Sequence, residues 1–258
     1  MRQALIPLLA ATAAFAQMGP DRSVTLGLSS FGPTFTGQIE GVQDGQPIQM
    51  DLEGDLGLAK DKAKVGFLFD YQGPRFGFLA QTGGTDYVGD RTTTRTVTID
   101  GTTYAAGTRV TSHLKLKTLE GIWTIRFVPL SVFWVGLDLG MESWKLDVDA
   151  TGLAITPVPG TTTATASVNA PIPQIGLSAG SRIPGGIFEI KGFYHYLGAK
   201  GAKYTRGGVD ARFFPVPHVG LRAFFETETF DVPKGSLQDD LMMKLDRKGA
   251  GFGLVVKF

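Results

Sequence analysis

The chain has 258 residues, and its 25 Lys and Arg nearly balance its 24 Asp and Glu, so it shows neither a basic nucleic-acid-binding surface nor an acidic tail, and no nucleic-acid partner is expected. Hydrophobic residues make up 43% of the sequence, too many for a disordered chain, and the absence of cysteine excludes a disulfide scaffold, thiolate metal ligands and a cysteine nucleophile. The 35 glycines and 18 phenylalanines favour many short strands joined by tight turns.

The start of the chain has the three parts of a secretory signal peptide. A short basic start ends at Arg2, residues 5–15 form an apolar run that is too short to cross a bilayer, and Ala14-Phe15-Ala16 is a small-x-small cleavage site. We therefore predict a cleaved signal peptide over residues 1–16 and one mature domain over residues 17–258.

Apolar and polar residues alternate with a period of two through the rest of the chain. Successive side chains of a β-strand point to opposite faces, so one face of each such segment meets an apolar environment. Phe133, Leu137 and Leu139 share one face, for example, while Asp138 and Glu142 share the other. The same pattern occurs in residues 24–28, 65–71, 76–80, 119–127, 187–197, 207–214 and 219–228. The downstream segments have about ten residues, the length of a tilted strand that crosses a bilayer.

The links between these segments alternate between short and long. The short links contain Pro or Gly and lie at residues 73–74, 128–130, 183–185 and 215–217, and the long polar links span 90–109, 149–167 and 231–240. Membrane barrels alternate in this way between periplasmic turns and outer loops. Within the first long link, Asp100-Gly101 between Thr-rich arms predicts a hairpin that projects above the membrane as a ribbon.

The end of the chain carries the most specific feature. Phe252, Leu254 and Val256 are in step with the terminal Phe258. Here the sequence resembles the outer-membrane β-barrel proteins of Gram-negative bacteria. That resemblance implies an outer-membrane location and a last strand that serves as the assembly signal for the barrel-assembly machinery. Residues 52–58 and 100–110 also resemble a group of uncharacterised predicted outer-membrane proteins, which implies the architecture but no activity.

We therefore predict an all-β fold, a transmembrane antiparallel up-and-down β-barrel. Counting back from the terminal phenylalanine, the predicted strands are 241–258, 218–231, 203–214, 187–199, 168–182, 131–148, 110–128, 75–90, 62–71 and 47–58. A further hairpin in residues 22–42, turning at Gly32-Pro33, raises this number to twelve, which we favour, with ten and eight as alternatives. A soluble barrel has the same periodicity with its apolar face inward, but the signal peptide, the turns and the terminal phenylalanine favour the membrane.

Charged residues on the second face form the main candidate site. The predicted lumen residues are Lys64, Asp70, Glu120, Arg126, Asp138, Glu142, Glu189, Lys191, Asp210, Arg212, Arg222, Glu226 and Lys257. In a barrel of eight or ten strands these side chains would fill the interior as ion pairs. In a barrel of twelve they would line a narrow water-filled path for small polar solutes.

An enzymatic alternative rests on one motif. Gly176-Leu177-Ser178-Ala179-Gly180 matches the Gly-x-Ser-x-Gly nucleophile elbow, which requires a helix after the serine, whereas here a strand pattern continues. His113, beside Ser112, and His195 are the histidines that a lipid hydrolase at the outer leaflet would need as a base. We expect no catalytic residues.

Metal and cofactor sites are not expected either. His113, His195 and His218 lack a ligand spacing, and the acidic pairs Asp147/Asp149 and Asp239/Asp240 are more typical of solvated loop edges than of calcium sites.

The predicted function is therefore that of a non-enzymatic outer-membrane barrel with a structural or surface-interaction role. Its expected partners are outer-membrane lipid and the barrel-assembly machinery. A narrow passive channel is the first alternative and an outer-leaflet lipid hydrolase is the second.

Overall fold

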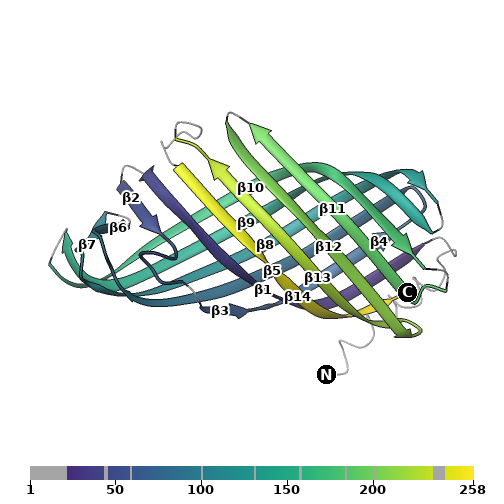
Figure 1. The fold of residues 1–258 in the computed structure, drawn as a ribbon, viewed down its shortest axis with the longest axis horizontal. Helices are drawn as coiled ribbons and strands as arrows, with labels where there is room; N and C mark the ends of the chain where they lie inside the picture. The colour runs from purple at the N-terminus through teal and green to yellow at the C-terminus, as the bar shows by residue number, and fades with distance from the viewer. Residues whose placement is uncertain are drawn as a thin grey trace, which may run out of the picture.

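The computed structural model describes residues 22–43, 46–58, 60–99, 101–130, 132–156, 159–183, 185–199, 201–234 and 242–258. The predicted signal peptide lies outside the described residues. These contain no helix long and apolar enough to cross a membrane. The strands are β1 (Ser23–Gln43), β2 (Gln46–Asp51), β3 (Lys60–Ala63), β4 (Val65–Gln72), β5 (Phe76–Thr92), β6 (Val97–Ile99), β7 (Thr102–Tyr104), β8 (Arg109–Pro129), β9 (Phe133–Thr156), β10 (Gly160–Arg182), β11 (Phe188–Ala199), β12 (Ala202–Val216), β13 (Val219–Val232) and β14 (Met242–Lys257) (Figure 1).

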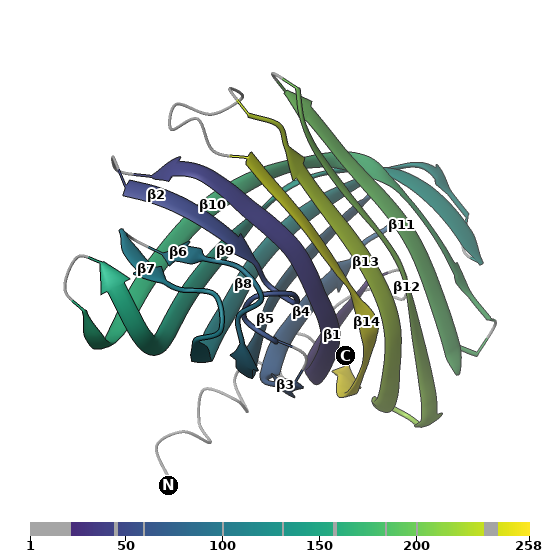
Figure 2. The same cartoon turned by 60° about the vertical axis from the view of Figure 1, so that its left-hand side comes forward.

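Ten of these strands close into an antiparallel ring, in the order β1, β4, β5, β8, β9, β10, β11, β12, β13, β14 and back to β1 (Figure 2). Closure leaves no strand edge facing hydrocarbon, where an unpaired backbone group costs several kcal/mol. The predicted all-β, up-and-down barrel is confirmed, with ten strands rather than the favoured twelve.

The count differs because residues 22–42 form no hairpin. β1 runs straight through Pro33, which lies opposite Gly249 of β14. Along this stretch β1 has no second neighbour, since its pairing with β4 ends at Ser30 and its pairing with β2 begins at Gln38. The Pro33 carbonyl points away from β14 and accepts a hydrogen bond from the Tyr87 hydroxyl at 3.0 Å. Proline is tolerated where a strand has a free side, because its missing N–H breaks no ladder bond.

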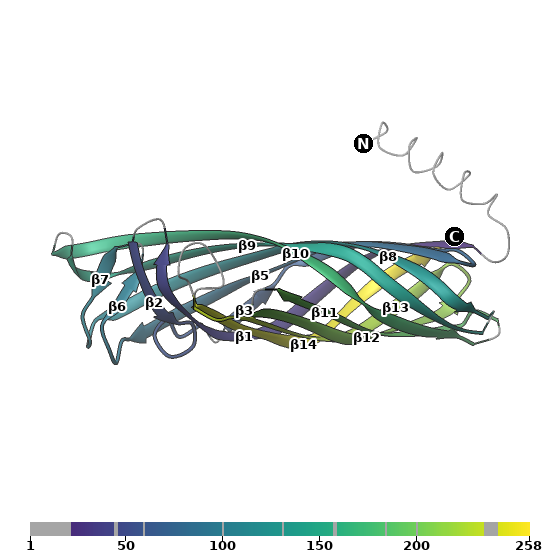
Figure 3. The same ribbon diagram turned by 90° about the horizontal axis from the view of Figure 1, so that it is seen from above.

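The four predicted short links are confirmed as turns, and they lie at the same end of the barrel as the C-terminus (Figures 1 and 3). In outer-membrane barrels the short turns face the periplasm. The predicted loop 149–167 is wrong: β9 and β10 stay paired from Phe133/Ser181 up to Ala154/Gly160. At the opposite, outer end, β10 therefore extends well beyond β11, whose pairing with it begins at Ile175, while β8 stays paired with β9 up to Thr111/Thr151.

The predicted hairpin around residues 98–102 exists as β6 and β7, but it does not project freely. β6 pairs with β2, and β7 pairs with the tip of β9. Val97, Ile99 and Tyr104 turn inward and are buried. The hairpin thus folds over the outer end of the barrel, because its alternate residues are apolar and have a core to enter.

A belt of exposed apolar side chains surrounds the half of the barrel nearer the short turns. It includes Leu28, Phe67, Phe76, Leu119, Trp123, Phe127, Leu139, Met141, Leu177, Ile190, Tyr194, Val209, Phe213, Leu221, Phe225, Phe252 and Leu254. An apolar outer face on every wall is what a surrounding bilayer requires.

Part-way along the longest strands, the apolar residues change from the outer face to the inner face. On β8, Trp123 is exposed outward and Glu120 is buried inward, but farther out Leu114 and Leu116 are buried inward and Lys115 is exposed. β9 and β14 change in the same way. We call the part with the apolar outer face the membrane zone, and the part beyond it, which includes residues 109–118 of β8 and 143–156 of β9, the outer zone.

The inside of the outer zone is a hydrophobic core rather than a lumen. Its buried residues include Phe35, Ile39, Leu52, Leu56, Tyr87, Ile99, Tyr104, Leu114, Leu116, Trp144, Leu146, Val148, Ile172, Met243 and Leu245. The turn that follows β2 supplies Leu52 and Leu56, and the ion pair between Asp55 and Arg95, at 2.7 Å, fastens that turn to the segment before β6. The outer zone is therefore built like a soluble barrel, with its apolar face inside.

Candidate functional site

Most of the predicted lumen charges do converge inside the membrane zone. Eight of them are buried: Asp70, Glu120, Asp138, Glu142, Asp210, Arg212, Arg222 and Glu226. Arg126, Glu189, Lys191 and Lys257 are partly buried near the short turns. Lys64 is the exception, because its ammonium pairs with Asp86 at 2.7 Å and its side chain is 41% exposed. It lies at the edge of the outer zone, where it also lines a small cavity together with Glu120 and Arg206.

The buried charges form two layers. Arg206, on β12, is the centre of the layer nearer the outer zone. Its guanidinium contacts Glu120 across the lumen and lies 2.8 Å from Glu226 and 2.9 Å from Glu228 on β13. Arg206 is only 2% exposed. A buried cation surrounded by three carboxylates crosses the bore with side chains from opposite walls and fixes the distance between them.

Arg247, on β14, extends the same layer. It lies 2.7 Å from Glu228 and 3.9 Å from Glu142. Glu142 also accepts hydrogen bonds from the Tyr204 hydroxyl at 2.7 Å and from the Gln174 amide at 3.0 Å. This layer forms the floor beneath the hydrophobic core of the outer zone.

A second charged layer lies nearer the short turns. Asp210 accepts from Arg212 at 3.1 Å and from Arg222 at 2.6 Å, and Arg212 also pairs with Asp70 at 2.6 Å. Arg222 reaches upward to Gln81, which donates to Glu120 at 2.6 Å. The two layers are therefore joined by hydrogen bonds, with a cavity of about 20 Å³ between them.

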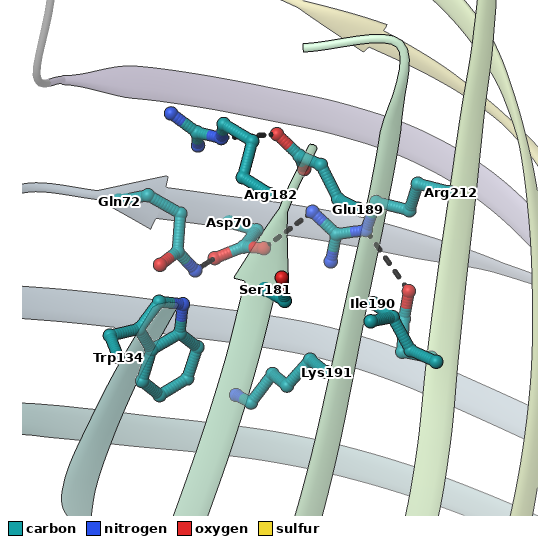
Figure 4. A pocket seen from close by; sticks show the side chains of 10 residues that line it. Asp70, Gln72, Trp134, Ser181, Arg182, Glu189, Ile190, Lys191 and Arg212 are labelled. Carbon is teal, nitrogen blue, oxygen red and sulfur yellow. Dashed lines mark hydrogen bonds and ion pairs between the residues drawn. The ribbon is translucent and has the colours of Figure 1, made fainter. Parts of the chain in front are cut away.

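The periplasmic mouth contains a small pocket beside Trp134 (Figure 4). The Arg126 guanidinium lies 4.5 Å from the centre of the indole ring and the Lys191 ammonium 5.8 Å from it. Glu189 is shared by Arg182 at 2.8 Å and Lys257 at 2.6 Å. The pocket has a volume of about 40 Å³, which is room for a few water molecules.

Ser178, His195 and Asp138 meet within the lumen, but not as a catalytic triad. The Ser178 hydroxyl donates to Asp138 at 2.8 Å, the Thr124 hydroxyl donates to it at 2.6 Å, and His195 Nε2 lies 2.9 Å from its other oxygen. The aspartate thus stands between serine and histidine, whereas a nucleophile needs the histidine next to it. All these side chains are buried inside the barrel, away from its outer rim.

The other predicted histidines lie apart. Ser112 is fully buried inside the outer zone, while His113 is exposed on the opposite face of the same strand. His218 lies in the turn after β12, where its Nδ1 is 2.7 Å from the Lys257 carbonyl. In the part of the chain that the structure describes, no group of three or more His, Cys, Asp or Glu is arranged to hold a metal ion.

Three buried charged residues of the interior were missed by sequence reasoning: Arg206, Glu228 and Arg247. Arg206 continues the parity of Asp210 and Arg212, and Glu228 that of Glu226. Their even positions, shared with the predicted lumen residues of the same strands, could have identified both residues as facing the interior. For Arg247 the signal is weaker, because it lies at the point where β14 exchanges its two faces.

The free space inside the membrane zone consists of small cavities, whereas a larger hollow of about 560 Å³, lined by residues such as Arg182, Pro217 and Phe258, lies at the periplasmic end. Besides the pocket at the mouth, cavities of about 30 Å³ and 20 Å³ lie next to Glu120 and Arg206. Each holds one or two water molecules at most. The charged side chains and these small cavities together occupy the inside of the membrane zone.

No protein-family model matches the chain, and no curated protein sequence matches it. Among solved structures, the outer membrane protease OmpT from Escherichia coli is similar with a TM-score of 0.57 at 10% identity, over 92% of this chain and 97% of OmpT. The chain folds as an outer-membrane β-barrel. The attachment invasion locus protein Ail of Yersinia pestis is matched at 12% identity, over 93% and 100% of the two chains, with a TM-score of 0.31. At 10% identity, the likeness of this outer-membrane barrel to OmpT shows a shared fold and not a shared activity.

Proposed function

We propose that this protein is a sealed outer-membrane barrel that conducts no solutes and catalyses no reaction, and that its role is to hold a rigid β-structure at the cell surface. The observation that supports this most is the hydrophobic core of the outer zone, which lies directly above the ion-paired interior. A barrel without a solute path through its interior is suited to a structural or surface-interaction role.

Two barriers in series oppose the passage of a solute. An ion would first have to displace the buried pairs around Arg206, and it would then meet side chains such as Leu114, Leu116 and Leu146, which offer it no polar partner. Burying an unpaired ion in apolar surroundings costs many kcal/mol. The combination favours a closed barrel over a narrow channel.

The outer surface of the outer zone is rich in hydroxyl groups, and Leu153 and Ile155 are exposed on it near the end of β9. Thr151 and Thr163 on neighbouring strands lie 2.8 Å apart through their hydroxyl oxygens, and Ser167 donates to Asp147 at 2.7 Å. Long paired strands with such a surface form a stiff wall outside the membrane, suited to contacts with other molecules of the cell surface.

Cysteine labelling on intact cells tests the seal, and the cysteine-free sequence gives a clean background. Thr111 and Ser112 are adjacent on β8, the first exposed outward and the second fully buried inward. A membrane-impermeant maleimide added from outside should label the Thr111→Cys variant and not the Ser112→Cys variant. Comparable labelling of both, in protein shown to be folded by its heat-modifiable gel mobility, would contradict a sealed outer zone.

A further inference from the structure

Two lysines face each other at the upper edge of the apolar belt. Lys117 of β8 lies directly opposite Lys145 of β9, and both side chains are exposed on the outer face. One step nearer the periplasm on this face, Leu119 is exposed at the top of the belt, opposite Ser143. The lysine pair therefore lies where the membrane zone meets the outer zone.

Like charges directly opposite one another on neighbouring strands destabilise a sheet. The next step outward on the same face has the ordinary arrangement, because Lys115 lies opposite Asp147 and its ammonium is 4.0 Å from Asp149. Neither Lys117 nor Lys145 forms an ion pair with any residue that the structure describes. The uncompensated pair occurs at the height of the membrane boundary.

A third lysine lies beside this pair. Lys117 is opposite Gly84 of β5, and a side chain at Gly84 would meet the Lys64 side chain, whose Cδ lies 3.4 Å from the position of the missing Cβ. Lys64 therefore extends over the glycine beside Lys117, and a side chain at Gly84 would also press on the Leu116 carbonyl, which lies 3.2 Å from the same position. Asp86, which lies beside these lysines, is already paired with Lys64.

We propose that Lys117 and Lys145, with Lys64 beside them, bind the phosphate of a lipid headgroup in the outer leaflet. A phosphate between the two ammonium groups would turn their repulsion into two attractive contacts. The lipid is favoured as its source because the exposed side chains of Leu119, Trp123 and Met141 directly below would contact acyl chains. At that height the neighbouring molecules present headgroups.

Folding of the mature protein into vesicles tests the proposal, because the effect of Lys117→Gln on the folding constant should change sign between two lipid compositions. Its folding equilibrium is measured by urea titration in phosphatidylcholine vesicles and in vesicles that also contain phosphatidylglycerol, with gel mobility confirming the folded state. In phosphatidylcholine, Lys117→Gln should leave the folding constant unchanged or raise it, because repulsion is relieved. With phosphatidylglycerol it should lower the constant about five-fold, the effect of one lysine near an anionic surface.

Lys115→Gln is the matched control, since Lys115 is on the same face, one step farther out, and already faces acids. Its effect should change less between the two lipids than that of Lys117→Gln. Lys145→Gln provides a second variant and should repeat the lipid-dependent loss. Equal lipid dependence at Lys115 and Lys117 would overturn the proposal. Stabilisation of the wild type by inorganic phosphate in phosphatidylcholine vesicles, lost in Lys117→Gln, would overturn the lipid as the source and assign the site to free phosphate.

Discussion

Glu120 and Glu142 lie directly opposite each other on β8 and β9, and both are buried inside the barrel. Two buried carboxylates directly opposite each other on neighbouring strands repel each other unless cations lie beside them. Arg206 contacts the first, and Arg247, from the opposite side of the ring, approaches the second to 3.9 Å. The like-charged pair thus makes the two arginines necessary, and the arginines tie distant strands together.

Replacing Arg206 by Met should destabilise the barrel strongly. The change leaves Glu120, Glu226 and Glu228 buried without their shared cation, and the loss of one partner of a buried ion pair costs about 3–5 kcal/mol. Urea unfolding in lipid vesicles measures the change. Arg109→Met, which removes an exposed pair with Asp90, is the control and should leave the free energy of unfolding nearly unchanged. Similar losses in both variants would argue against a structural role for the interior network.

In the outer zone, the inner face of β8 is apolar and its outer face is polar. Substitutions at the adjacent residues His113 and Leu114 should therefore have very different effects on stability. Leu114→Arg places a charge in the apolar core of the outer zone and should prevent stable folding or cost several kcal/mol, whereas His113→Arg on the exposed face should have little effect. Heat-modifiable mobility and urea unfolding report both. If His113→Arg were the more damaging change, the assignment of inner and outer faces in the outer zone would be wrong.

Tyr104 fastens the β6–β7 hairpin to the long strands. Its hydroxyl donates to the Ala150 carbonyl at 2.8 Å and accepts from the Ala164 N–H at 3.2 Å, and burial raises the pKa of the hydroxyl, so it stays protonated. Tyr104→Phe removes these buried hydrogen bonds and should cost about 1 kcal/mol. Limited proteolysis should then cut residues 93–108 faster. Thr103→Ala, next to it and only part-buried, should show a smaller increase.

Phe258 closes the ring at the seam between β14 and β1. Its backbone N–H donates to the Val24 carbonyl at 2.8 Å and its carbonyl accepts from the Val24 N–H at 3.0 Å. Deleting Phe258 removes both bonds and the predicted assembly signal that it forms with Phe252, Leu254 and Val256, so the level of folded protein in the outer membrane should fall. Phe258→Tyr keeps the backbone and an aromatic ring and should assemble normally. Wild-type levels of the deletion variant would contradict the terminal-signal prediction.

The sequence was informative about the barrel because its strands alternate strictly in the membrane zone. Nine of the ten predicted segments correspond to ring strands, and the tenth, residues 47–58, belongs instead to β2 and the turn after it. The ring strand that was not predicted is β1, because Gly32-Pro33 was interpreted as the turn of a hairpin. A proline beside a stretch without a second neighbour looks like a turn in sequence and is tolerated in the strand.

The hydrophobic core of the outer zone was not predicted, although a signal for it is present. Apolar residues of β8 occupy odd positions at Trp123 and Ile125 and even positions at Leu114 and Leu116. This change of parity without a bulge means that the strand passes from lipid to water on its outside. Which arginine meets which carboxylate was beyond prediction, because those contacts cross the lumen between strands far apart in sequence.

Single-channel conductance of the refolded mature protein in a planar bilayer tests the sealed interior most directly. The ion-paired layers around Arg206 and the apolar core above them predict no stable conductance steps from protein whose folding is confirmed by gel mobility. Stable, ion-selective steps from the wild type would show a continuous water path and contradict the account.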